Sequence, residues 1–431
     1  MERLALVAYS LLFYLAMPLV WLRLLWRGRR QPAYRQHLGE RHALYPQALA
    51  CRPRPLIWLH AVSLGETRAA APLIDALLEA YPDHDLLLTH MTPTGREAGS
   101  ELLSARPERL ERLAQAYLPY DLPDACGRFL DHFRPRLGLL METELWPNLI
   151  DAARRRRLPV ALINGRMSAR SARGYRRLSS LIQPALRSLS AVAAQTAADA
   201  ERLQQLGARQ PIVCGNLKFD VTPPADKLQL GARWRQAIGR RPVWVLASSR
   251  DGEEALLLDV LAAVAVADLL LVVVPRHPQR FAEVAALIAG RGLAFCRRSS
   301  AELPSRATQV WLGDSMGEMA AYYALADLTL IGGSLLPFGG QNLIEAAACG
   351  CPLLLGPHTF NFAQASEDAI ACGAARRVLD APQAALVVAE LFAQPADLHA
   401  MHTAATAFSQ AHRGATARTV ALIEKLTVKV A

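Results

Sequence analysis

Residues 137–148 read LGLLMETELWPN, and residues 269–278 read LLLVVVPRHP. Each stretch opens with an uninterrupted apolar run and then changes abruptly to polar residues and proline. A short apolar run without alternation is typical of a strand that is buried on both faces of a parallel sheet. Both stretches therefore predict an α/β fold in which polar side chains follow the end of each buried strand.

The same pattern recurs on either side of these two stretches. In the first half we expect strands at Leu56–Ala61, Asp85–His90, Gln115–Leu118, Leu137–Met141, Val160–Asn164, Ala191–Gln195 and Ile212–Gly215. A linker with two prolines spans residues 220–226. The pattern then restarts, with strands expected at Val243–Ser248, Leu269–Val274, Leu293–Cys296, Gln309–Leu312, Leu328–Gly332, Pro352–Leu355 and Arg377–Leu379.

Amphipathic stretches such as Thr67–Tyr81 and Trp146–Arg157 lie between the strands, and Pro395–Lys429 is Ala-rich and helical in pattern. This alternation predicts two doubly wound, Rossmann-like domains with helices on both faces of each sheet. Ligands of such domains bind at the carboxyl ends of the strands, so we expect a cleft that both domains face.

Length and composition limit the class of protein. A chain of 431 residues exceeds the size of a single core, and 20% charged residues are too few for a disordered chain. A mean hydropathy of +0.13 suggests a globular protein with a limited membrane element. The seven cysteines are odd in number and scattered, which excludes a secreted disulfide scaffold and favours reduced, buried thiols in the cytosol.

The net positive charge of the chain comes entirely from the first half. Residues 1–220 hold 30 Lys and Arg against 20 Asp and Glu, whereas residues 221–431 hold 18 of each. An anionic partner is therefore expected to meet the first half, although a merely solvated surface explains the same excess.

The first thirty residues predict a membrane anchor. Leu4–Leu22 is a run of 19 uncharged residues, followed by Trp26 and an arginine cluster at residues 27–30. A signal peptide carries its charge before the apolar run, and here the order is reversed. The positive-inside rule then places the downstream chain in the cytoplasm. A helix lying in the membrane interface is the alternative to a spanning one, and in either case we expect residues 1–30 to contribute little to the core of either domain.

Two common nucleotide motifs are missing from the sequence. It has no G-x-x-x-x-G-K-[ST] loop and no G-x-G-x-x-G after the first strand. This counts against a nucleotide hydrolase and a dinucleotide oxidoreductase. No His/Cys cluster has metal-ligand spacing, and Cys349-Gly350-Cys351 favours packing over ligation.

Carboxylates follow two of the predicted strands in the first half. Glu66 comes at the start of a helix after Leu56–Ala61, where it is either a first-turn cap or a general base. Glu142 and Glu144 follow Leu137–Met141, and helix capping accounts for them equally well. Residues 151–200 hold ten arginines, which either bind phosphate or carboxylate groups or form a solvated helix face.

Strand ends in the second half carry anion-binding features. Arg276 follows Leu269–Val274, and Gly313–Glu318 follows the strand Gln309–Leu312. Gly332–Ser334 and Gly339–Glu345 flank another helix, whose preceding glycines expose backbone N–H groups to a phosphate. Glu345 is placed to accept hydrogen bonds from ribose hydroxyls. Together these signals predict a nucleotide site in the second domain.

The chain resembles the bacterial 3-deoxy-D-manno-octulosonate (Kdo) transferases of lipopolysaccharide assembly, from its anchor to near its C-terminus. The motifs that carry the resemblance are Ser63–Glu66, Met91–Gly95, Leu118–Asp121, Glu142–Asn148, Gly215–Asp220, Pro275–Pro278, Met316–Glu318, Gly340–Glu345 and Gly356–Asn361.

The resemblance implies a GT-B glycosyltransferase fold, CMP-Kdo as donor, the lipid A precursor lipid IVA as acceptor, and neither a metal ion nor a cofactor. It also implies a proton acceptor at Glu66 and transition-state stabilisers at Glu142 and Lys218. The implied CMP site comprises Pro275, Arg276, Met316, Gly317, Glu318, Asn342, Leu343, Ile344 and Glu345. Arg250 and Gln341 depart from the family pattern, which puts detail of the donor site in question.

We accordingly expect a membrane anchor at 1–30, an acceptor domain at 31–220 and a CMP-sugar domain at 221–431 with a C-terminal helical segment. The expected location is the cytoplasmic face of a bacterial inner membrane, and nucleic acid is not an expected partner. Two alternatives stay open at this point. One is a GT-B transferase that uses a different nucleotide sugar, and the other is a non-catalytic, membrane-anchored lipid-binding protein.

Overall fold

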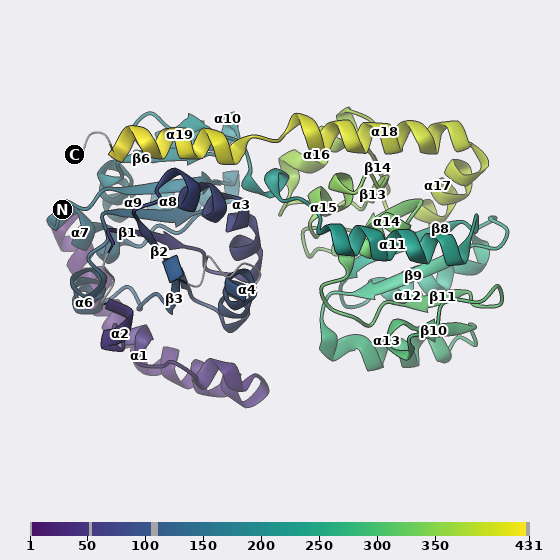
Figure 1. Ribbon diagram of the computed structural model, residues 1–431, viewed down its shortest axis with the longest axis horizontal. Coiled ribbons are helices and arrows are strands. Elements are labelled where there is room, and N and C mark those ends of the chain that lie inside the picture. The colour runs from purple at the N-terminus through teal and green to yellow at the C-terminus, as the bar shows by residue number, and fades with distance from the viewer. Residues whose placement is uncertain (1, 51–53, 105–110, 428–431) are drawn as a thin grey trace. The chain divides into compact units, whose positions relative to one another are not determined.

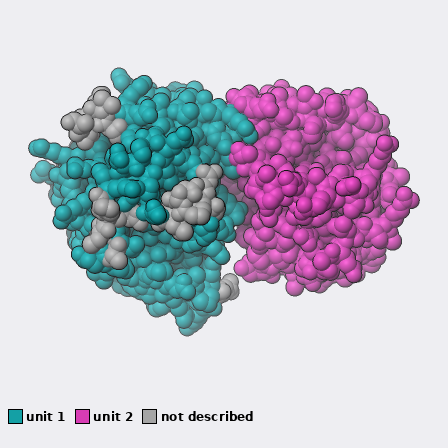
Figure 2. All heavy atoms as spheres, in the orientation of Figure 1, with its two compact units in different colours: residues 1–221, 413–431 teal, residues 222–412 magenta. Residues whose placement is uncertain are grey.

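The computed structural model describes residues 2–50, 54–104 and 111–427 and divides into two compact units (Figures 1 and 2). Unit 1 comprises Met1–Val221 and Arg413–Ala431, and unit 2 comprises Thr222–His412. The first crossing between the units falls inside the linker predicted at 220–226. Lys429, in the predicted C-terminal helical stretch, lies outside the described residues.

Unit 1 is built on a seven-stranded parallel sheet in the order β3-β2-β1-β4-β5-β6-β7. Its strands are β1 (Leu56–His60), β2 (Asp85–His90), β3 (Leu113–Tyr117), β4 (Leu137–Met141), β5 (Val160–Gly165), β6 (Ala191–Ala194) and β7 (Ile212–Val213). Its described helices are α1 (Glu2–Arg30), α2 (Gln47–Ala50), α3 (Leu64–Ala80), α4 (Pro93–Ser104), α6 (Pro123–Phe133), α7 (Pro147–Arg155), α8 (Ala169–Arg177), α9 (Ser179–Ser188), α10 (Ala197–Gln205) and α19 (Ala415–Thr427), with 3-10 turns η1 (Pro32–Arg35), η2 (Glu40–His42) and η3 (Leu217–Asp220).

Unit 2 repeats the design with a second seven-stranded parallel sheet, in the order β10-β11-β9-β8-β12-β13-β14. Its strands are β8 (Val243–Ser249), β9 (Leu270–Pro275), β10 (Phe295–Arg297), β11 (Val310–Leu312), β12 (Leu328–Ile331), β13 (Leu353–Leu355) and β14 (Ala375–Arg377). Its helices are α11 (Ala225–Ile238), α12 (Glu253–Val260), α13 (Phe281–Ala289), α14 (Met319–Leu325), α15 (Leu343–Ala348), α16 (Ala363–Ala371), α17 (Ala381–Ala393) and α18 (Pro395–Ala411), with 3-10 turns η4 (Leu261–Ala263), η5 (Pro278–Arg280) and η6 (Arg298–Ser300).

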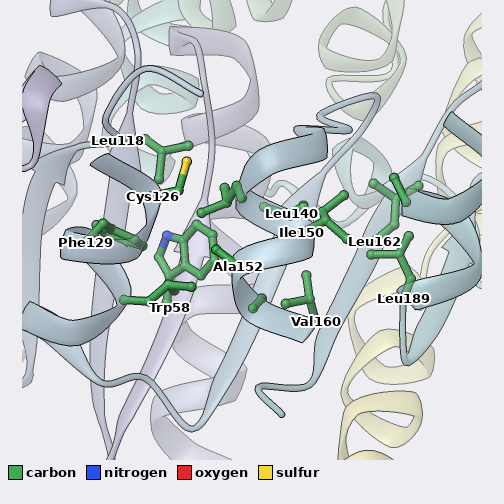
Figure 3. Packing of buried hydrophobic residues seen from close by; sticks show 14 of the residues in the cluster. Trp58, Leu118, Cys126, Phe129, Leu140, Ile150, Ala152, Val160, Leu162 and Leu189 are labelled. Atoms are coloured by element: carbon green, nitrogen blue, oxygen red, sulfur yellow. The ribbon is translucent and has the colours of Figure 1, made fainter. Parts of the chain in front are cut away.

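The central strands are buried on both faces, as their apolar runs predict. Every residue of β1 is buried, and successive residues point to opposite faces of the sheet. Trp58 packs into the core on one face, where its ring meets Phe129 of α6 edge-on at 5.0 Å (Figure 3). Ile57 and Leu59 pack into a second core beneath α3. The strand is therefore held by two cores.

The fold class predicted from the sequence is confirmed. Each of the fourteen predicted strands coincides with a strand of the structure, with ends shifted by at most two residues. The six described cysteines are free thiols, of which Cys126, Cys214 and Cys351 are buried and Cys372 is exposed. Cys51 lies outside the described residues.

The C-terminal segment belongs to both units, whereas the sequence pattern placed all of 221–431 in the second domain. Helix α18 packs in unit 2, and after Gly414, at φ 93°, the chain continues as α19 on α3 of unit 1. Asp220 accepts hydrogen bonds from the N–H groups of Gly414 (2.7 Å) and Thr416 (2.5 Å). It thereby caps the first turn of α19 from a distant point in the chain.

Helix α1 is the one described helix that is long and apolar enough to cross a membrane, with a mean hydropathy of 2.0 in its most apolar window. We expected it to contribute little to the core, and the structure differs. Met17 and Leu24 are buried, and Met17 joins the core that contains Trp58. One face of α1 is therefore part of unit 1.

The cap of α19 gives a first prediction. Asp220→Ala removes two charge-assisted hydrogen bonds, each worth about 1.5–3 kcal/mol, so residues 415–427 should exchange their amide hydrogens at least about tenfold faster. Hydrogen exchange followed by peptide mass analysis measures this effect. The control is Asp226→Ala, an exposed acidic residue in the first turn of α11, which should leave exchange in α19 unchanged. Equal exchange in α19 of the parent and Asp220→Ala would show that Asp220 does not hold it.

Candidate active site

The carboxylates singled out in the first half come together at one edge of the unit 1 sheet. Strands β1 and β4 are neighbours, and the strand order reverses between them. Glu66 lies in the first turn of α3, which follows β1, and Glu142 follows β4 directly. This reversal point at the carboxyl ends of strands is where open α/β sheets bind their ligands.

Glu66 is held by the loop that precedes its helix. One carboxylate oxygen accepts a hydrogen bond from the N–H of Val62 at 2.8 Å, and the other accepts one from the Ser63 hydroxyl at 3.2 Å. Burial raises the pKa of Glu66 to about 7, and the negative charge of Glu142 adds to the shift. A carboxyl with this pKa can take up and release a proton near neutral pH.

Glu142 has the opposite character because it is paired. Lys218 donates a hydrogen bond to its carboxylate at 3.0 Å, and an Arg166 guanidinium nitrogen lies 4.0 Å from its second oxygen. Burial opposes ionisation of Glu142, but these two cations outweigh it, so that the pKa of the carboxyl is lowered. Glu142 is therefore a fixed negative charge.

The ion pair is positioned by local backbone geometry. Glu142 adopts φ 55°, a left-handed conformation that costs a non-glycine residue energy. Lys218 lies in η3, whose first turn is held by hydrogen bonds from backbone N–H groups to the side-chain oxygens of Asn164 and Asn216, both at 3.0 Å. The ends of strands β4 and β5 and the start of η3 thus meet at this pair.

Sequence reasoning named Glu144 in a motif but gave it no role. It accepts a hydrogen bond from the Trp146 indole at 2.8 Å, and burial together with Glu142 raises its pKa. His60, the last residue of β1, is fully buried with its ring edge-on to Trp146, and burial lowers its pKa to about 3. His60 is therefore a neutral wall of the site, and its place at a strand end was the available signal.

The predicted nucleotide residues of unit 2 lie at the carboxyl ends of β9, β11 and β12, three strands of one sheet. Pro275 is the buried last residue of β9, and Arg276 follows it with its N–H bonded to Ser249 O at 3.0 Å. After β11, Met316 is 54% exposed and Gly317 adopts φ 74°. Glu318 pairs with Arg298 at 3.0 Å, so this carboxylate has a structural partner.

The turn before α15 holds the rest of the predicted set. Asn342 caps the helix by accepting a hydrogen bond from the Ile344 N–H at 3.2 Å. Leu343 and Ile344 are buried, whereas Glu345 is half-buried. The half-buried side chains of Asn342 and Glu345 can therefore contact a ligand, whereas the buried Leu343 and Ile344 anchor the turn.

Glu253 is a buried carboxylate that the sequence did not single out, and it holds together the loops that follow β8 and β12. Glu253 accepts hydrogen bonds from the N–H groups of Arg250 (2.9 Å), Gly333 (2.5 Å) and Leu335 (3.0 Å). Near Gly333 lie the two residues that the resemblance marked as unusual: the Gln341 amide and the Arg250 side chain both approach this glycine. Arg250 also covers the Phe338 ring at 4.8 Å.

Comparisons with known proteins bear on this arrangement. A family model described as 3-deoxy-D-manno-octulosonic-acid transferase matches residues 36–221. The chain is 48% identical over 417 residues to the 3-deoxy-D-manno-octulosonic acid transferase of Bordetella pertussis, with 94% of this chain and 96% of that protein covered. It is 38% identical to the transferase of that name from Haemophilus influenzae, with 82% of each covered.

A solved glycosyltransferase from Rickettsia africae aligns with 88% of this chain and all of its own, at a TM-score of 0.62 and 13% identity. The Anabaena protein HepE, solved with UDP, covers 87% of this chain at a TM-score of 0.58 and 15% identity. At these identities the likeness shows the fold alone. The GT-B type fold expected from the sequence is thereby confirmed.

The raised pKa of Glu66 predicts a pH-dependent cost to stability. Between pH 4.5 and about 7 the folded state holds a proton that the unfolded state has released, so stability falls as pH rises through this window. Glu66→Gln lacks this loss. We compare the melting temperature of Glu66→Gln with that of the parent at each pH. The difference, variant minus parent, should be larger at pH 8 than at pH 5 by at least about 2 °C, the shift that 1 kcal/mol produces in a domain of this size.

Thermal melts at the two pH values test this prediction. Glu79→Gln, an exposed position on the same helix α3, is the control and should show no pH-dependent difference. Glu142 is paired with Lys218 and its pKa is lowered, so it stays ionised in the folded state of every variant between pH 5 and pH 8. A pH-independent offset between Glu66→Gln and the parent would contradict the assigned shift.

Proposed function

This chain belongs to the 3-deoxy-D-manno-octulosonic acid (Kdo) transferase family, and we propose that it transfers Kdo from CMP-Kdo to lipid IVA with inversion at the anomeric carbon. Membership makes it a glycosyltransferase. The observation that carries the finer proposal is the pair of unlike carboxylates at the β1/β4 edge, Glu66 with a pKa near 7 and Glu142 held ionised by Lys218.

Glu66 is proposed as the general base. The acceptor is a sugar hydroxyl, a poor nucleophile at neutral pH, and a positioned carboxylate removes its proton as the bond to the donor forms. A pKa near the working pH keeps a fraction of Glu66 ionised while leaving it basic enough to drive the transfer. The nearby negative charge of Glu142 raises that basicity further.

Glu142 and Lys218 are proposed to stabilise the transition state. The donor is attacked at its anomeric ketose carbon through an oxocarbenium-like state, so positive charge develops on the sugar and negative charge on the departing phosphate. A fixed carboxylate and a fixed ammonium match these two charges. Because they already neutralise each other, little reorganisation is required when the reaction occurs.

The CMP site is proposed at the β9, β11 and β12 edge of unit 2. The leaving group is a phosphate monoester anion, which needs charge stabilisation more than protonation. Arg276 supplies charge-assisted hydrogen bonds, and backbone N–H groups near the left-handed Gly317 add to them. Glu345 accepts hydrogen bonds from ribose hydroxyls. In this proposal the reaction proceeds without a metal ion.

The acceptor and the location follow from charge and from the N-terminal helix. Lipid IVA is a bisphosphorylated lipid, and the basic first half of the chain suits it. We place the protein at the cytoplasmic face of a bacterial inner membrane, with α1 as its attachment.

Loss of the proposed base gives a direct test. Glu66→Gln should reduce transfer from CMP-Kdo to lipid IVA by about 10²–10⁴-fold, the usual contribution of a general base. CMP affinity should stay within about twofold because Glu66 belongs to the other unit. Products resolved by mass report transfer, and a CMP titration reports binding.

Glu79→Gln, on the exposed side of α3, should retain parental activity. In the parent, the logarithm of kcat/KM should rise with pH and level off above about 7, as Glu66 ionises. Activity of Glu66→Gln within threefold of the parent, or a flat pH profile between 5 and 8, would remove Glu66 from the role of base.

The donor site is tested at Arg276. Arg276→Ala should weaken CMP binding by about 10–150-fold, the equivalent of 1.5–3 kcal/mol for a charge-assisted hydrogen bond. The melting temperature should stay close to that of the parent. Calorimetric CMP titration and a thermal melt measure the two effects.

Arg280, in the following turn, is the contrasting variant. Its guanidinium contacts Glu254 at 2.6 Å and Glu283 at 2.8 Å, so Arg280→Ala should lower the melting temperature. An Arg276→Ala variant that behaves in the same way, destabilised but with normal CMP affinity, would assign Arg276 to structure instead of to the site.

A further inference from the structure

Polar and apolar contacts tie one face of α1 to unit 1. Tyr9 donates a hydrogen bond to the buried Asp121 at 3.0 Å, and the buried Ser10 donates one to Asn148 at 2.9 Å. Farther along, Met17 and Leu24 are buried, and Met17 joins the main core of the unit. Figure 1 shows α1, in purple, along the flank of this unit.

These contacts extend over most of the helix. In the first turn Glu2 lies 3.8 Å from Arg187 of α9, and near the far end Trp21 stacks on His42 of η2 with ring centroids 5.2 Å apart. A helix of 29 residues is about 43 Å long at 1.5 Å per residue. The stretch of α1 from Glu2 to Trp21, about 28 Å at 1.5 Å per residue, is therefore held against the same globular unit.

The opposite face of α1 is exposed and apolar. Among its exposed apolar side chains are those of Leu4, Leu11, Leu15, Leu19, Leu22 and Trp26. At about 100° per residue these six fall within an arc of about 80°, with Ser10, Met17 and Leu24 on the other side of the helix. A continuous apolar face of this size on a soluble unit marks a surface that is covered by something else.

The contacts that α1 makes with unit 1 exclude a spanning orientation. A spanning helix places its two ends about 30 Å apart, on opposite sides of the hydrocarbon layer, with lipid around it. Because Glu2 is paired with Arg187, a spanning α1 would draw the polar helix α9 and its arginine to the far side of the bilayer. The buried Asp121 would likewise lie at hydrocarbon depth.

Arginines near both ends of α1 match an anionic lipid surface. A cavity of about 460 Å³ at the N-terminal end of α1 is lined by Arg3, Arg154, Arg187 and Arg209, against the carboxylates of Glu2 and Asp151. Arg23 and Arg29 are exposed toward the other end. Juxtamembrane arginines are attracted to anionic headgroups.

We propose that α1 lies flat in the headgroup boundary of an anionic bilayer, with the leucine face in the acyl chains and unit 1 resting on the membrane surface. The helix is a docking surface for lipid and does not cross the membrane. This orientation is independent of the sugar that the enzyme transfers, because it rests only on contacts within unit 1.

A depth profile tests the orientation. Leu4→Cys, Leu15→Cys and Leu22→Cys in the full chain, each labelled with bimane, are bound to vesicles of phosphatidylethanolamine and phosphatidylglycerol. Lipids brominated at different acyl positions then report the depth of each label by quenching. Leu386→Cys is the matched control, since Leu386 of α17 is 70% exposed, close to the 76% of Leu15, and belongs to unit 2. The parent with its own cysteines gives the background.

An in-plane helix places all three labels at the same shallow depth, about 5–10 Å below the headgroups, with Leu386→Cys unquenched. A spanning helix places Leu15 near the bilayer centre and Leu4 and Leu22 progressively shallower, and that V-shaped profile would overturn the proposal. Absence of quenching at all three positions would also overturn it. None of these readings uses Kdo transfer, so failure of the proposed activity leaves the test intact.

Discussion

The structure depends on the burial of two parallel sheets on both faces. Strands such as β1 and β9 pack helices above and below, so their side chains must be apolar and their middles offer no place for chemistry. In the central strands β1, β4, β8 and β9, the serine and histidine side chains occur only where the strands end. At the carboxyl edge the chain leaves the core, helices begin, and backbone N–H groups become available. The candidate residues of both units lie at these edges because the cores allow them nowhere else.

Within unit 1, that edge separates two chemically identical groups by environment. Glu142 is the more deeply buried carboxylate, yet it is the ionised one, because Lys218 and Arg166 supply opposite charge. Glu66 accepts hydrogen bonds from Val62 and Ser63, which lower its pKa, but no cation contributes to the shift. The effect of burial therefore outweighs these hydrogen bonds, and the pKa of Glu66 rises. The unfavourable φ of Glu142 is the conformational cost of bringing the pair together. This edge of unit 1 therefore places a fixed negative charge beside a carboxyl that titrates near neutral pH.

Features set by local pattern were predictable from the sequence, and features set by distant contacts were not. The strands were found because apolar runs define them, and Glu66 because it follows such a run. Asp220 caps α19 from 194 residues away, and no local sequence pattern indicates such a contact. The return of the C-terminal helix to unit 1 was therefore not predicted. Glu253 reads as an ordinary first-turn acid of α12, although it collects N–H groups from the loop after β12. The pKa difference between Glu66 and Glu142 was equally out of reach, since Lys218 lies 76 residues from its partner.

The buried carboxylate of Asp121 links helix α1 to the candidate site of unit 1. Asp121 accepts a hydrogen bond from Tyr9 of α1 and, at 3.1 and 2.9 Å, from the N–H groups of Asn148 and Leu149 in the first turn of α7. The N-cap residue of α7, Trp146, makes no capping hydrogen bond with its own side chain, so Asp121 serves as the cap. The segment that precedes α7 is the short connection from β4 that carries Glu142 and Glu144. A helix lying in the bilayer surface is thus joined, through one carboxylate, to the turn that orients the acidic loop. A flexible tether would let the site sample many heights above the membrane, whereas this connection sets one, which suits the lipid acceptor proposed above, whose acyl chains would hold its sugar at a fixed height.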